Sequence, residues 1–437
     1  MKLRNILTSL ALVCLTAGAQ NTPAGGAVDF DRWFTDATLR TDYVFSGTAK
    51  TQSIALDELR KSEGWFGRRV NLNQVPLRGN GQITMTDSDT GTVIFRMSFS
   101  TLFQEWQTSE EATKVTKAFE NVFQLPMPRR DADVKVILYD THDRVTAEFE
   151  HHVKVDDILI RPLLKSDVAD HKMLWKGGDS RDAIDVVIVA EGYTKDEADV
   201  FYADAQVACD ELLKYEPFVN YKERFNVTAV ALESAESGVS IPHADVWKKT
   251  ALSSSFDTFY SNRYLTTLRL KQLNDALTGI PYEHILIIAN TDNYGGGGIY
   301  NSYTLTAAHH RMFKPVTVHE FGHSFAALAD EYFYDDQYEE FYFPDVEPWE
   351  QNITTLKDFD AKWADMLPEG TPVPTPTDGL AETDMERIGV YEGGGYQSKG
   401  VYRPFRDCRM RTNEVPDYCA VCKRAIGRVI QFYTEQH

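Results

Sequence analysis

The residues of this 437-residue chain with the clearest chemical potential are His319, Glu320 and His323, which follow the order His-Glu-x-x-His. In a helix, residues four positions apart lie on one face, so both imidazoles would point the same way and bind one ion. Zinc prefers a tetrahedron of nitrogen, sulfur and oxygen ligands, and a catalytic site leaves one position for water. Glu320 would reach that water and take its proton. The spacing therefore predicts a Zn²⁺ site that activates water.

The sequence around the motif predicts the helix that must hold it. Pro315 suits a first helical turn, and Val316, Phe321 and Phe325 supply apolar positions. The preceding residues 299–306 are typical of an edge strand, which would lie beside the site and pair with an extended substrate. This context favours a metal site over the alternative, two histidines on an ordinary helix.

The third protein ligand is open between Asp330 and Glu331. If the helix continued straight, Asp330 would lie about 10 Å along the axis from His323, which is too far for one metal ion. Either the helix ends near Ala327, or the third ligand comes from elsewhere in the chain. We expect Asp330 to be the ligand, with Glu331 as the alternative. The competing interpretation is that this acidic pair forms caps or ion pairs around the site.

The first residues predict an export signal over residues 1–19. A basic start precedes an apolar run at residues 6–16, and small residues stand before a cleavage site after Ala19. Cys14 raises the alternative of a lipoprotein. The apolar run is too short to span a bilayer, and no later segment is apolar enough to do so. We therefore expect a protein that is periplasmic, on the cell surface or secreted, without a transmembrane segment.

Removal of this signal leaves four cysteines: Cys209, Cys408, Cys419 and Cys422. Export to an oxidising compartment permits disulfides. The last three would also suit a second zinc site or a redox pair, but they lack an obvious fourth ligand. We expect a structural disulfide from Cys408 to Cys419 or Cys422, and a buried thiol at Cys209.

Composition limits the classes of partner. The chain carries 65 acidic and 45 basic residues, for a formal charge of −20, which argues against binding to nucleic acid. The apolar share of 43% is enough for a sizeable core in each of two domains. No feature of the sequence indicates an oligomeric state.

Two regions differ in pattern. Residues 20–162 alternate in the manner of strands separated by turns, with one helix expected near 110–123. Residues 163–437 alternate strands with helices, which predicts an α/β domain. The strands expected in the first region are 41–48, 81–86, 92–98, 134–139 and 144–152. The elements expected in the second are strands at 184–190, 225–232 and 285–289 and helices at 195–215, 255–277 and 421–433.

The stretch His-Glu-Phe-Gly-His-Ser-Phe-Ala-Ala-Leu-Ala-Asp-Glu-Tyr, residues 319–332, resembles the signature of the IgA-peptidase family of secreted bacterial zinc metallopeptidases. Further similar stretches extend the resemblance over nearly all of the mature chain. They lie at residues 79–83, 98–106, 400–404, 409–411 and 418–422.

The resemblance implies a zincin-like α/β catalytic domain related to metzincins, preceded by an all-β, sandwich-like domain. It implies Zn²⁺ at the two histidines and Glu320 as general base. In metzincins the chain turns after the second histidine and returns a third ligand, and a methionine lies beneath the zinc. Met410 is the candidate for that Met-turn, with a gap-filling core methionine as the alternative. The family often has glycines where this chain has Ala326 and Ala327.

A donor for the developing oxyanion is also expected, and Tyr332, Tyr396 and Tyr402 are the candidates. These features imply a secreted zinc endopeptidase acting on extracellular proteins, with immunoglobulins as candidate substrates. The alternative is a surface module that binds protein or glycan and has an inactive zinc site. The intact Glu320 favours the enzyme, because a decayed site need not keep its base.

Overall fold

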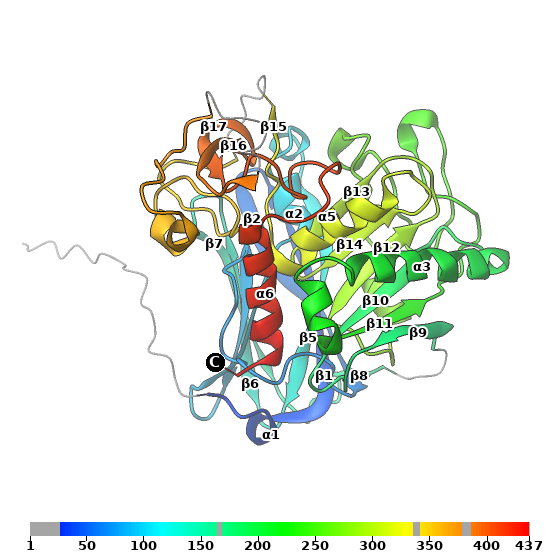
Figure 1. Ribbon diagram of the computed structural model, residues 1–437. Helices are drawn as coiled ribbons and strands as arrows, with labels where there is room; N and C mark the ends of the chain where they lie inside the picture. The colour runs from blue at the N-terminus through cyan, green and yellow to red at the C-terminus, as the bar shows by residue number, and fades with distance from the viewer. Residues whose placement is uncertain (1–26, 164–167, 335–340, 378–385, 437) are drawn as a thin grey trace, which may run out of the picture.

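The computed structural model describes residues 27–163, 168–334, 341–377 and 386–436. The predicted signal peptide and Cys14 lie outside these ranges. None of the helices within them combines the length and the apolar character needed to cross a membrane. Figure 1 shows the strands of the N-terminal region on one side, the α/β region on the other, and the C-terminal helix α6 (Ala420–Thr434) alongside them.

The N-terminal region is built from two four-stranded sheets, with strand orders β5-β1-β2-β8 and β4-β3-β6-β7. Aromatic rings from the two sheets meet in the space between them: Phe45 lies against Phe99, and Tyr43 against Phe149. This agrees with the expected β-rich N-terminal region. Its helices and strands are α1 (Phe30–Trp33), β1 (Phe34–Thr48), β2 (Thr51–Glu63), β3 (Gly81–Asp87), β4 (Val93–Phe99), α2 (Leu102–Trp106), β5 (Lys117–Pro128), β6 (Ala132–Tyr139), β7 (Val145–Val153) and β8 (Arg161–Pro162).

The helix expected at residues 110–123 is wrong. Only Glu111–Thr113 form a short 3₁₀ turn, and strand β5 follows. Phe119 and Phe123 are buried on the same face of β5, because residues an even number of positions apart share a face of a strand, and β5 pairs with β1 along most of its length. Strand β2 was not expected, because its residues are mostly polar and partly exposed.

The second region contains a six-stranded mixed sheet of order β13-β14-β12-β10-β11-β9, whose four central strands are parallel. Antiparallel β9 and β13 form its two edges. The elements of this region are β9 (His171–Lys176), β10 (Ile184–Glu191), α3 (Ala198–Leu212), β11 (Phe225–Val230), α4 (Leu270–Ala276), β12 (His284–Ala289), β13 (Gly296–Ile299), β14 (Tyr303–Ala307) and α5 (Phe313–Ala326).

Both faces of this sheet are covered, which explains the continuous apolar run of β10. Val186 and Ile188 belong to the hydrophobic cluster that contains side chains of α3, α5 and α6. Val187 and Val189 belong to the cluster that fills the N-terminal sheets. The N-terminal region therefore serves as the second covering layer of the sheet. The boundary between residues 162 and 163 stays a prediction.

Two further expectations were wrong in detail. Of the residues 255–277 expected to be largely helical, only α4 is an α-helix, and Asp257 and Phe259 have φ values of 61° and 53°, which a right-handed helix does not allow. The edge strand expected at residues 299–306 is wrong: these residues hold the end of β13, a turn and most of the inner strand β14, and the edge strand is β13. The Gly296 N–H of that edge donates to the Arg263 carbonyl, so one end of the edge is already paired.

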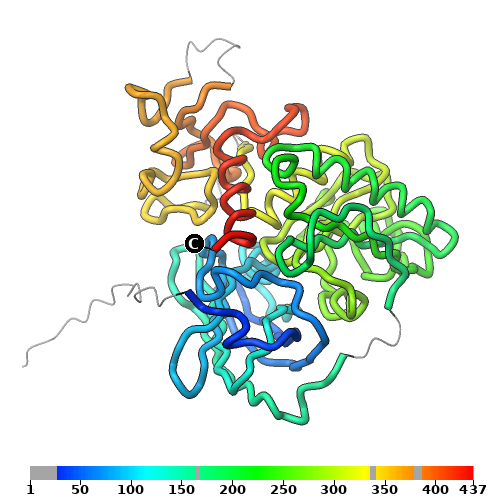
Figure 2. Tube along the Cα trace, turned by 60° about the horizontal axis from the view of Figure 1, so that its bottom comes forward, coloured from blue at the N-terminus to red at the C-terminus, as the bar shows by residue number. Residues whose placement is uncertain are grey.

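The C-terminal part adds a three-stranded sheet of order β15-β17-β16 and helix α6. Figure 2 shows α6 between the N-terminal strands, the α/β region and the segment that precedes it. Asn71 donates to the Phe432 carbonyl near the end of α6, and Arg424 pairs with Asp365. The strands are β15 (Phe333–Tyr334), β16 (Tyr391–Gly394) and β17 (Tyr396–Arg403).

Candidate active site

Helix α5 carries His319, Glu320 and His323 against the β13–β14 hairpin. A Cβ atom on Gly298 of β13 would lie 2.2 Å from the Glu320 carbonyl oxygen, so the strand and the helix touch at this glycine. On the opposite side of α5, the Phe321 ring stacks with the Phe325 ring in the core beneath the sheet. The helix is thereby fixed with its motif toward the hairpin.

The two histidines and Asp330 converge on one point. The His319 Nε2 lies 3.0 Å from the His323 Nε2 and 3.0 Å from the Asp330 Oδ1, and the His323 Nε2 lies 3.3 Å from the same oxygen. Three ligands of one tetrahedral zinc ion would be separated by about 3.3 Å. Among the described residues, this Asp330 oxygen has no well-aligned hydrogen-bond donor although it is buried. The donor set therefore fits a zinc ion.

Main-chain carbonyls orient both rings. The His319 Nδ1–H donates to the Arg409 carbonyl over 2.9 Å, and the His323 Nδ1–H donates to the Leu328 carbonyl. With the proton on Nδ1, each ring presents the lone pair of Nε2 toward Asp330. This tautomer is the one that a metal ligand requires.

The end of α5 explains how Asp330 reaches the histidines. Ala327 adopts the left-handed conformation, with φ 51° and ψ 39°. The Ala327 N–H donates to the His323 carbonyl, which is the hydrogen bond of an αL C-cap motif, and the Leu328 N–H donates to the Gly322 carbonyl. The chain thus reverses directly after the helix, as the position of Asp330 in the sequence required.

Ala327→Gly is expected to raise the free energy of unfolding by about 0.5 kcal/mol. Relief of the left-handed strain, about 1–2 kcal/mol, exceeds the loss of one buried methyl group, about 0.8 kcal/mol. Urea unfolding measures this change. Ala326→Gly is the matched control: it removes the same group from a helical, buried position and should lower stability by about 1–2 kcal/mol. Equal losses in both variants would contradict the strain argument.

The charges of the site are strongly coupled. Burial would lower the pKa of His323, but the carboxylate of Asp330 more than offsets this effect and the pKa rises to about 9. The same interaction holds the pKa of Asp330 well below its usual range against its burial. Burial also raises the pKa of Glu320, which the histidines oppose. A glutamate with a raised pKa is a better proton acceptor than an ordinary one.

Of the three tyrosines proposed as oxyanion donors, two lie at the site. The Tyr396 hydroxyl donates to the Asp330 Oδ2, and the Tyr332 ring packs edge-on against Tyr396. Tyr402 lies elsewhere: its main chain pairs with Thr354, and the charges that act on its hydroxyl are those of Glu392 and Lys399. The structure therefore brings Tyr332 and Tyr396 close to Asp330 and leaves Tyr402 away from it.

Met410 lies directly beneath the motif helix. It is fully buried, and a Cβ atom on Gly322, one residue before His323, would lie 3.0 Å from its sulfur. Its carbonyl accepts the N–H of Glu331 over 2.8 Å. Met410 thus packs under the helix as a core residue, and its role as a Met-turn stays a prediction.

Glu331 points away from the histidines. One carboxylate oxygen accepts a hydrogen bond from Asn352 and lies 3.2 Å from the Cys422 sulfur. The disulfide expected from Cys408 to Cys419 or Cys422 is absent: all three described thiols are free, and the sulfurs of Cys408 and Cys422 lie 3.7 Å apart. Cys209 is buried in α3 as expected.

The N-terminal region contributes a carboxyl group that we had not expected near the site. The Tyr264 hydroxyl donates to Glu105, and the Tyr264 ring packs against Gly297 of β13. Burial raises the pKa of Glu105 to about 7, and the charges of His323 and Glu320 act on it. Glu105 lies within residues 98–106. In the sequence this stretch supported the family resemblance but gave no sign of a role at the site.

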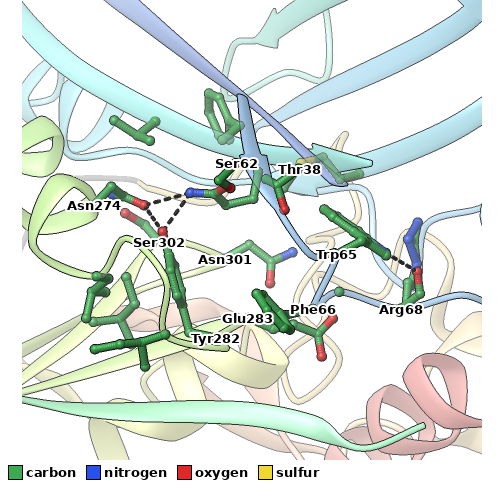
Figure 3. A pocket seen from close by; sticks show the side chains of 18 of the residues that line it. Thr38, Ser62, Trp65, Phe66, Arg68, Asn274, Tyr282, Glu283, Asn301 and Ser302 are labelled. Carbon is green, nitrogen blue, oxygen red and sulfur yellow. Dashed lines mark hydrogen bonds between the residues drawn. The ribbon is translucent and has the colours of Figure 1, made fainter. Parts of the chain in front are cut away.

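A separate cavity of about 120 Å³ lies between the N-terminal region and the mixed sheet. Figure 3 shows Trp65 and Arg68 from the first and Tyr282 and Asn274 from the second. Polar side chains that line the cavity form hydrogen bonds with one another. The Tyr282 hydroxyl, for example, donates to the Asn274 side chain over 2.7 Å. None of the histidine-site residues lines it, so the cavity belongs to the packing between the two regions.

Two histidines and a glutamate on one helix, with an aspartate returned by a tight turn, are features of a metallopeptidase site. The family model described as IgA Peptidase M64 matches residues 173–387 and 379–430, and the model described as Peptidase M64 N-terminus matches residues 29–150. The chain belongs to the IgA peptidase M64 family, which confirms the resemblance. No curated protein matches it.

Proposed function

We propose that this protein is an exported zinc-dependent endopeptidase in which His319, His323 and Asp330 hold the metal and Glu320 is the general base. The observation that carries the proposal is the convergence of two imidazole Nε2 atoms and one carboxylate oxygen within 3.0–3.3 Å of one another. Both histidine side chains are partly exposed, whereas the Asp330 side chain is buried. This arrangement suits a site that admits a substrate.

A zinc ion bound there would polarise water and the carbonyl of the peptide bond. Glu320 adjoins the first ligand and would accept a proton from the attacking water and deliver it to the leaving amine. Tyr396, whose hydroxyl donates to Asp330, would redirect that hydrogen bond to the oxygen on which negative charge develops. The carbonyls of Arg409 and Leu328 keep the imidazoles in the required tautomer.

Other features support the finer assignment. The central parallel strands, the antiparallel edge strand β13 and Met410 beneath the helix support a zincin-like domain related to metzincins. The edge strand β13 would pair with an extended peptide beyond Gly296. The name of the family makes immunoglobulin A the first substrate to test, and the features of residues 1–19 support export.

Removal of the metal tests the proposal. Treatment with a chelator is expected to abolish cleavage of casein or immunoglobulin A, and one equivalent of Zn²⁺ at the histidine site should restore it, because the metal supplies the electrophile. Peptide products are followed by mass spectrometry. Cleavage that continues unchanged in protein shown to be free of metal would refute the zinc mechanism. Full metal occupancy without cleavage of any protein would favour a binding module.

Tyr396→Phe is expected to lower kcat by about 10²–10³-fold with the metal retained, because one donor to the oxyanion is lost. Tyr402→Phe is the matched control and should leave kcat unchanged, since Tyr402 lies apart from the ligands. Steady-state kinetics and zinc analysis of both variants decide the matter. Equal kcat values in the two variants would remove Tyr396 from the mechanism.

A further inference from the structure

A second group of metal-binding side chains lies on the other side of the Asp330–Glu331 pair. It consists of Glu331, Cys408, Cys419 and Cys422, and each offers one ligand atom within 4.8 Å of all the others. All four side chains are buried, whereas the histidines are partly exposed. The group joins three segments of the chain: the loop after α5, the segment before Met410, and the start of α6.

The spacing of the sulfur atoms is that of a metal site. The Cys408 and Cys422 sulfurs are 3.7 Å apart, whereas a disulfide requires about 2.05 Å. Two thiolates of one tetrahedral zinc ion would lie about 3.8 Å apart. The Cys419 N–H donates to the Cys408 sulfur over 3.2 Å, which stabilises a thiolate there. Cys419 is the N-cap residue of α6 and Cys422 lies in the first turn, where the helix dipole favours negative charge.

The carboxylate of Glu331 gives an independent indication. Glu331 has no exposed surface, and its Oε2 atom has no hydrogen-bond partner among the described residues. Burial of a carboxylate without full compensation is costly, so a cation is expected beside it. The buried Arg403 attracts this carboxylate, but its Nη1 donates to the carbonyls of Glu392 and Gly393 and not to Glu331.

We propose that Glu331, Cys408, Cys419 and Cys422 form a second, structural zinc site. Three sulfurs and one carboxylate oxygen complete a tetrahedron and leave no position for water, which is the pattern of a structural centre. Zinc accepts this mixture of thiolate and carboxylate ligands, and its binding releases the thiol protons to solvent. The fourth ligand that the cysteines lacked in the sequence is supplied by the residue beside Asp330.

Such a site would help to position His319 and Asp330 through the main chain that links the two groups of residues. The Glu331 N–H donates to the Met410 carbonyl, and the neighbouring Arg409 carbonyl accepts the His319 Nδ1–H. Asp330 and Glu331 would then bind two different ions from successive positions of one loop. The structural ion would thus hold the loop that returns Asp330 to the histidines.

Zinc and thiol analysis of the exported full chain, purified without reductant, tests the proposal. We expect two zinc ions per chain in the wild type. The double variant Cys419→Ser, Cys422→Ser and the double variant His319→Ala, His323→Ala should each keep one. Cys209→Ser, a buried cysteine outside the group, should keep both. In the wild type, alkylation of Cys408, Cys419 and Cys422 should require denaturation with a chelator, and peptide mapping should find no disulfide among them.

A wild type with one zinc ion, lost only in the histidine variant, would overturn the second site. So would a disulfide-linked peptide joining Cys408 to Cys419 or Cys422. Both measurements are made on the wild type, so misfolding of a cysteine variant cannot hide the answer. A wild type whose single ion is lost only in the cysteine variant would instead support this site and refute the histidine site, which separates the two proposals.

Discussion

Glu320→Gln is expected to lower the rate of peptide hydrolysis by about 10²–10⁴-fold while the protein keeps its metal. The amide has nearly the shape of the carboxylate but cannot accept the proton of the attacking water. The half-exposed position of Glu320 on α5, beside both ligands, leaves the metal contacts of the histidines unchanged. The measurement is kcat/KM on casein or immunoglobulin A together with zinc content.

Glu369→Gln is the matched control, because it makes the same substitution at an exposed residue and should retain wild-type activity. A Glu320→Gln variant that cleaves at the wild-type rate would exclude Glu320 as the base. A variant that loses zinc would show instead that the carboxylate acts on the metal ligands.

Asp330→Asn is expected to weaken zinc binding at the histidine site by more than about 100-fold and to abolish cleavage. Loss of a residue that only hydrogen-bonds to a metal ligand typically lowers the metal affinity by about 10–100-fold. Loss of a direct ligand should lower it by more. The Asp330 Oδ1 also contacts both imidazoles, at 3.0 Å from the His319 Nε2 and 3.3 Å from the His323 Nε2. Competition with a zinc-binding dye at fixed pH measures the affinity.

Asp365→Asn, which removes an exposed carboxylate paired with Arg424, should bind zinc as the wild type does. The competing ligand assignment makes the opposite prediction. If Asp330→Asn retained zinc at the histidines and Glu331→Gln lost it there, Glu331 would be the third ligand.

The sequence predicted well those elements whose apolar pattern matches one geometry. Strand β10 is an unbroken apolar run, and β3 and β6 alternate cleanly, so their positions were predicted almost to the residue. Strand β2 carries no such pattern, because none of its residues is fully buried. In β5, helix-forming residues precede the alternating aromatic residues, and the pairing with β1 decides the outcome.

At the site, the motif spacing predicted the two histidines and the base, because four residues make one helical turn. The position of Asp330 depends on a left-handed alanine, which local preferences disfavour and the surrounding packing imposes. The choice of Tyr396 over Tyr402 and the meeting of Glu331 with Cys422 join residues 66 and 91 positions apart. No local pattern records contacts of that range.

The hydrophobic cluster that runs from the N-terminal sheets into the mixed sheet has a consequence for how this protein can be divided. A fragment beginning at residue 163 would expose the apolar face formed by Val187, Val189, Ile285 and Ile287. Exposed patches of that kind drive aggregation. The N-terminal region therefore cannot be removed or exchanged freely. A recombinant peptidase, or a chimaera with new specificity, has to carry both regions from the same parent.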